Sequence, residues 1–122
     1  MHKLKARLVA LACLAVLPMA EAHHSFAMFD LGKTVTVEGT VKSFQYTNPH
    51  IWLVVTVEDA HTRQAVDWAI EGGSPNNLTR AGWNRTLIKA GDKAAVTVHP
   101  LRSGAPGGSL MGVQVGKLKL GT

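Results

Sequence analysis

The chain has 122 residues, with 13 Lys and Arg against 8 Asp and Glu, and a formal net charge of +5. Its one cysteine, Cys13, lies in an apolar stretch near the N-terminus. The rest of the chain can therefore hold neither a disulfide nor a thiolate metal site. The basic residues are scattered, without an arginine stripe or interleaved aromatic residues, so we expect no nucleic-acid partner.

The first 22 residues have the three parts of a secretory signal peptide. Three basic residues precede an apolar run at residues 8–17, and Ala20 and Ala22 supply the small side chains expected before a cleavage point. The run is too short to span a bilayer stably. We therefore expect cleavage after Ala22, export from the cytoplasm and no membrane span in the mature chain.

The mature chain is predicted to begin with an arm and continue into one β-rich domain. Residues 23–33 show no periodicity and form the predicted N-terminal arm, and the domain covers 34–122. From Thr34 to the Asn48-Pro49 pair, apolar and polar residues alternate as in a half-buried strand. Gly39, in the middle of this strand, predicts a bulge or a sharp bend.

Two more strands follow at 51–58 and 64–71, and a short helix comes after them. Ser74 can cap the helix, Pro75 suits its first position, and Gly82 ends the apolar pattern. Further strands are predicted at 93–101 and 110–120. A loop rich in glycine and proline separates them at 102–109, and the last strand is expected to bend at Gly112 or Gly116.

The order of these elements favours a small all-β fold. Three strands, a short helix and two strands match the five-stranded barrel of the OB-fold, so an OB-fold-like barrel is the predicted architecture. A plain β-sandwich remains the alternative. Trp68 has the size to plug such a barrel, provided that its indole N–H finds an acceptor.

The two histidines after the cleavage point are candidate metal ligands. With cleavage after Ala22, the new amine, His23 and His24 offer a nitrogen-rich set of the kind that suits Cu(II). With cleavage after Ala20, His23 would be the third residue, and could wrap Cu(II) or Ni(II) with the amine, two amides and its imidazole. The alternative is a solvated terminus without metal.

A third histidine lies on a loop that flanks the ligand face of OB-folds. His50 follows Asn48-Pro49 and precedes Trp52, in the loop between the first two strands. We therefore include His50 as a candidate metal ligand, together with the neighbouring Asn48 and Trp52 as candidate binding residues.

Two charged residues complete the candidate set. Glu71 ends the third strand just before two glycines, where its carboxylate could bind a ligand; a hydrogen bond to the backbone of the glycine turn is the more common arrangement. Arg102 is the only charged residue of the 102–109 loop. No nucleophile elbow, phosphate loop or zinc-helix histidine pair is present in the sequence, so we expect no enzymatic activity.

Several blocks of the sequence are distinctive: His23-His24-Ser25-Phe26-Ala27-Met28-Phe29-Asp30, Gly39-Thr40-Val41, Asn48-Pro49-His50, Glu71-Gly72-Gly73-Ser74-Pro75, Gly82-Trp83, and Pro100-Leu101-Arg102 with Gly107-Gly108. With these blocks the chain resembles a family of small exported bacterial proteins, domain of unknown function 6152. The resemblance covers essentially the whole mature chain and implies a periplasmic location. It implies no activity, substrate or cofactor.

Together these features predict a periplasmic, non-enzymatic binding protein. A transition metal such as copper is the expected ligand, held by His23, His24 and His50, with Asp30 or Glu71 supplying an oxygen or orienting an imidazole. Two alternatives remain open. The chain could be a protein-interaction module of an exported assembly that uses its strand edges and the 102–109 loop, or a small enzyme.

Overall fold

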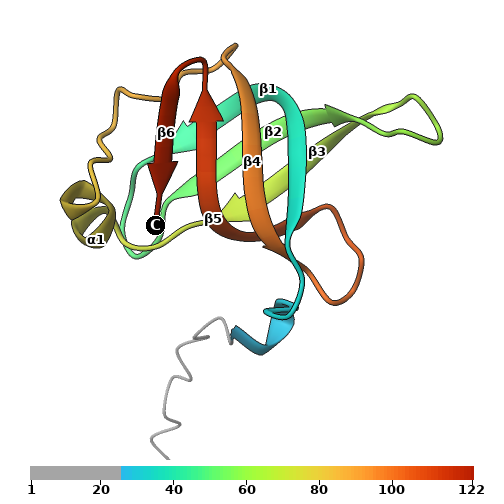
Figure 1. Cartoon of the computed structure of the whole chain (residues 1–122), viewed down its shortest axis with the longest axis horizontal. Helices are drawn as coiled ribbons and strands as arrows, with labels where there is room; N and C mark the ends of the chain where they lie inside the picture. Colours follow the sequence, from blue (N-terminus) through green and yellow to red (C-terminus); the bar gives the residue numbers. More distant parts are fainter. Residues whose placement is uncertain (1–25) are drawn as a thin grey trace, which may run out of the picture.

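The computed structural model describes residues 26–122, so the expected signal peptide and the His23-His24 pair lie outside the described residues. The chain folds into a β-barrel with one short α-helix (Figure 1). Its strands are β1 (Val35–Gln45), β2 (Trp52–Glu58), β3 (Ala65–Glu71), β4 (Lys93–Pro100), β5 (Gly107–Val115) and β6 (Leu118–Gly121). A 3-10 turn, η1 (Phe26–Met28), precedes β1, and α1 (Pro75–Arg80) lies between β3 and β4.

Five of the strands close on themselves. The hydrogen-bonded order is β3-β2-β1-β4-β5-β6, and a further pairing between β3 and β5 completes the ring. That pairing is parallel and joins Ala69 to Gly107, Ile70 to Gly108 and Glu71 to Ser109. The predicted OB-fold-like barrel is therefore confirmed, and the sandwich alternative is wrong.

The closing pair of strands needs glycine in β5. A Cβ atom at Gly108 would stand 2.5 Å from the carbonyl oxygen of His99, on the neighbouring strand β4. A side chain at this position would therefore push β5 away from β4 at the point where β5 also meets β3. Gly107 and Gly108, which the sequence analysis assigned to a loop, begin β5 instead, because they pair with Ala69 and Ile70 of β3.

β1 is long because it serves both halves of the barrel. Its residues 35–40 pair with β4, and its residues 40–45 pair with β2. The bulge predicted at Gly39 lies further along, where the register shifts between Val41 and Ser43. Gly39 has a different role, because β2 passes so close that a Cβ atom there would collide with the carbonyl oxygen of Thr56.

The C-terminal segment departs from the sequence prediction. The run at 110–120 was expected to be one bent strand, but a turn at 116–117 divides it into β5 and β6. β6 pairs with β5 over four residue pairs, outside the closed ring. The apolar positions move from 113 and 115 before the turn to 118 and 120 after it, and the sequence prediction took this change of phase for a bend within one strand.

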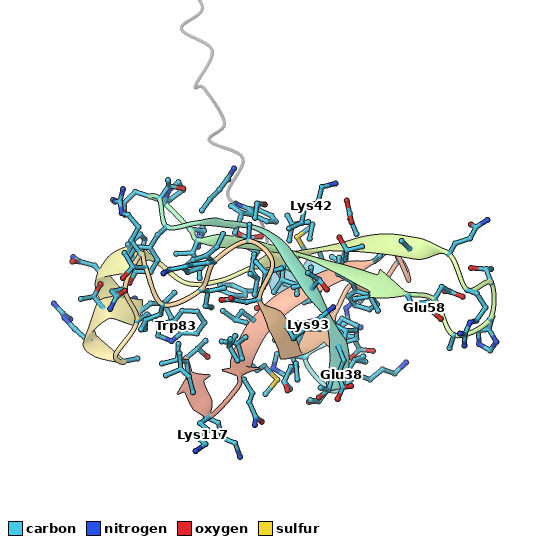
Figure 2. All side chains as sticks on the ribbon, turned by 90° about the horizontal axis from the view of Figure 1, so that it is seen from above. Glu38, Lys42, Glu58, Trp83, Lys93 and Lys117 are labelled. Carbon is cyan, nitrogen blue, oxygen red and sulfur yellow. The ribbon has the colours of Figure 1, made fainter. Side chains whose placement is uncertain are left out.

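Trp83 covers one end of the hydrophobic core. Its side chain is 1% exposed, and its indole N–H donates to the carbonyl oxygen of Gly121 at 2.8 Å. Figure 2 shows it beside α1, whose N-terminus is capped by Ser74 as predicted. The assignment of the plug to Trp68 is wrong, since that residue is only half-buried at the margin of the core. Within the described part of the chain, no helix combines the length and the apolar character needed to cross a membrane.

We expect Gly39→Ala to lower the free energy of unfolding by about 1–3 kcal/mol, the usual cost of forcing atoms into filled space. Urea unfolding followed by circular dichroism measures the change. Gly121→Ala is the matched control, because a Cβ atom there meets nothing within 4 Å. Equal losses in the two variants would contradict the close approach of β2 to Gly39.

Candidate functional site

A buried carboxylate lies on the outer face of the barrel. Glu71 of β3 is paired with Trp52 of β2, so the two side chains share a face of the sheet. Their chain neighbours Ile70 and Leu53 are fully buried in the core, which places Glu71 and Trp52 outside. Glu71 is nevertheless only 8% exposed, and it is the one buried charged residue among residues 26–122.

The N-terminal arm covers this part of the outer face. Phe29 forms an isolated β-bridge with Leu101 and is 5% exposed. The backbone N–H of Asp30 donates to the carbonyl oxygen of Pro100 at 2.8 Å. Figure 1 shows η1 at the end of the barrel, beside the loop between β4 and β5. The arm is therefore attached to the barrel as a short extra strand.

Arg102 fastens the same arm. Its backbone N–H donates to the carbonyl oxygen of Met28 at 2.9 Å, and its Nε donates to that of Ala27 at 3.1 Å. The sequence analysis placed Arg102 on a loop that could face a ligand. In the structure its Nε serves the arm, so Arg102 positions the cover over Glu71.

His50 faces the buried carboxylate. Its Nδ1 lies 3.0 Å from the carbonyl oxygen of Gly72. A carbonyl can only accept a hydrogen bond, so Nδ1 carries the proton, and Nε2 of the neutral ring keeps a free lone pair. Nε2 lies 3.8 Å from Oε1 of Glu71, which is too long for a hydrogen bond.

Two hollows meet at Glu71. The first, which we call the His50 cavity, has a volume of about 250 Å³ and is lined by Phe26, Phe29, His50, Glu71 and Ser109, among others. The second, which we call the Trp52 hollow, has a volume of about 190 Å³, with Met28, Phe29, Trp52, Glu71, Leu101 and Pro106 in its lining. Phe29 and Glu71 belong to both, so the arm covers the two hollows together.

The structure brings together three of the residues singled out in the sequence and leaves others apart. His50, Trp52 and Glu71 line the two hollows. Asp30 lines neither, since its Oδ1 accepts from the backbone N–H of Gly32 at 3.2 Å and its Oδ2 lies 3.7 Å from Nζ of Lys33.

Asn48 is exposed and lines neither hollow. The hydrogen bond to the glycine turn comes from His50, whereas we expected it from Glu71. His23 and His24 lie outside the described residues.

Sequence reasoning missed two residues of the site: Phe29, the arm residue that covers it, and Ser109, a polar residue of its lining. Phe29 was overlooked because the arm shows no periodicity in its sequence; in the structure it is the only buried residue at 26–31. Ser109 was assigned to a loop, but its pairing with Glu71 brings it into the His50 cavity. Only the strand register places either residue, and register between distant segments cannot be read from local pattern.

A larger depression lies at the other end of β5 and carries less chemistry. It measures about 480 Å³ and is open, with Glu38, Lys93 and Gln114 as its polar side chains. Nζ of Lys93 is already engaged, since it donates to the hydroxyl of Thr40 at 2.8 Å. The polar groups of the smaller His50 cavity converge instead, and we treat that cavity as the candidate site.

We expect Phe29→Ala to lower the free energy of unfolding by about 3 kcal/mol, as for other buried phenylalanines. Phe26→Ala should change it by less than about 0.5 kcal/mol, because Phe26 is 69% exposed. Chemical denaturation of both variants provides the measurement. Equally small effects would show that the arm is not part of the cooperatively folded domain.

Comparison with known proteins gives one match. No curated protein and no solved structure matches the chain. A family model described as a family of unknown function, DUF6152, matches residues 10–110. That match covers most of the 122 residues, and with it the chain is a member of the DUF6152 family.

Proposed function

We propose that this protein is an exported, non-enzymatic binding protein of the periplasm, and that its ligand is a transition-metal ion, Cu(II), bound in the His50 cavity. The observation that supports the proposal is the approach of a ring nitrogen of His50, one that its backbone hydrogen bond leaves unused, to a buried carboxylate. Nε2 of His50 and Oε1 of Glu71 are 3.8 Å apart with no hydrogen bond between them.

The two groups have the chemistry of a partial metal site. Nitrogen and oxygen donors bind metal ions at about 2.0–2.2 Å, so one ion can contact both atoms across their separation. The backbone carbonyl of Gly72 fixes the tautomer and ring orientation of His50, as second-sphere partners of ligating histidines do. The carboxylate supplies negative charge where water is largely excluded, since the Glu71 side chain is 10% exposed.

The remaining ligands come from the start of the mature chain. No group of three or more metal-ligating side chains occurs among residues 26–122, so His50 and Glu71 need partners from elsewhere. The backbone links His24 to Phe26, which lines the His50 cavity, and this limits their Cα atoms to about 7 Å apart. With cleavage after Ala22, the amine, His23 and His24 complete a nitrogen-rich set that favours Cu(II).

The arrangement favours binding over catalysis. A hydrolytic triad needs one ring nitrogen of the histidine on the hydroxyl nucleophile and the other on the carboxylate. Ser109 lines the cavity, but the ring nitrogens of His50 face the Gly72 carbonyl and Glu71. This supports a site that holds a ligand without activating a nucleophile.

Titration of the processed protein with Cu(II) tests the proposal. The chain is expressed with its own signal, its N-terminus is confirmed by mass spectrometry, and affinity is measured by calorimetry. We expect His50→Ala to weaken Cu(II) binding at least tenfold, and electron paramagnetic resonance to show loss of one nitrogen ligand.

His99→Ala is the matched control, because Nδ1 of His99 is also held by a backbone carbonyl, that of Lys33, at 2.8 Å. Its Cu(II) affinity should equal that of the unaltered protein. Affinity that falls in His23→Ala and His24→Ala but not in His50→Ala would refute the shared site and leave only a terminal motif.

An interaction module is a second candidate, favoured by exposed apolar side chains. Phe26, Met28 and Leu31 are 69%, 41% and 53% exposed and all lie within the arm. Mass spectrometry of proteins cross-linked to the chain in the periplasm tests this reading. One stoichiometric partner, lost in the Phe26→Ser/Leu31→Ser double variant and kept in Lys117→Ser, would support it.

A further inference from the structure

The Trp52 hollow has a lining unlike that of the His50 cavity. Met28, Phe29, Leu101 and Pro106 form apolar walls around Trp52, and Glu71 is the only charged residue of the lining. We infer that this hollow binds a methylated ammonium head group, of the kind that choline carries, at a site that shares Phe29 and Glu71 with the His50 cavity. The inference does not depend on metal binding.

The aromatic side chains favour a cation. Trp52 and Phe29 belong to different segments, β2 and the arm, and both border the hollow. Aromatic faces attract cations, tryptophan most strongly, and quaternary ammonium groups are often bound between such faces. The thioether of Met28 adds a polarizable contact.

Glu71 supplies the opposite charge. Its side chain is nine-tenths buried, and in the described part of the chain its carboxylate accepts no hydrogen bond. Its one ion-pair contact among the described residues is with Nε2 of His50, at 3.8 Å, and His50 lines the other cavity. A carboxylate that keeps little contact with water and accepts no hydrogen bond is destabilised, and a cation bound beside it would offset that cost.

Methylation and size narrow the ligand class. An ammonium with N–H groups would need several acceptors, whereas Glu71 is the only carboxylate or amide side chain of the lining. A trimethylammonium group has no N–H to satisfy and presents methyl groups to apolar walls. At about 190 Å³ the hollow is smaller than the 300–1,000 Å³ typical of sites for drug-sized ligands, so it suits a head group.

Nuclear magnetic resonance titration tests the inference on the unaltered protein. Choline is compared with 3,3-dimethylbutan-1-ol, which has the same shape with carbon in place of the charged nitrogen, and a chelator is present throughout. We expect choline to bind at least tenfold more tightly and to shift the indole N–H signal of Trp52. The signal of Trp83, which is buried and bonded to Gly121, should not move.

Variants separate this site from the metal site. Trp52→Leu and Glu71→Gln should each weaken choline binding at least tenfold, while His50→Ala leaves it unchanged. For Cu(II) the two variants should behave the other way round: His50→Ala should weaken binding, and Trp52→Leu should leave it unchanged. Equal affinity for choline and its neutral analogue, or no binding of choline at all, would overturn the inference whether or not copper binds.

Discussion

The parallel pairing of β3 with β5 is the contact on which the rest of the structure depends. It consists of three residue pairs, and it turns a twisted sheet into a closed barrel. The same pairs set Ser109 beside Glu71 and direct Ile70 into the core. A parallel pair cannot be joined by a tight turn, so α1 and β4 lie between the two strands. The loop between β4 and β5 thereby reaches the face that carries Glu71.

That face breaks a general rule of barrel construction. Outward residues of a strand normally face water, and a carboxylate there would be solvated. Here the arm, held by Leu101 and Arg102, excludes most of the water from Glu71. Burying a carboxylate destabilises the fold unless something compensates its charge. A local rule broken at one place, in a chain that otherwise follows it, indicates a functional site.

Much of the fold could be predicted because its signals are local. The alternation of apolar and polar residues predicted the strands, and Ser74 followed by Pro75 predicted the start of the helix. The division of the last strand was missed because the change of phase between Val115 and Leu118 was interpreted as a bend within one strand. The site was predicted only as separate candidates: His50 and Glu71 each stand at the end of a strand, beside a turn. Their approach to one another depends on the register of β2 with β3, and their cover on a bridge between distant residues.

The bridge between the arm and the β4–β5 loop also constrains the order of folding. Phe29 and Leu101 lie about seventy residues apart in the chain, and contacts of such long range form slowly because the intervening segment must first be arranged. We therefore expect the arm to dock on the barrel only after β4 and β5 have paired. The part of the domain synthesised first would then be completed last, and the proposed ligand beneath the arm would distinguish a finished domain from a partly folded one.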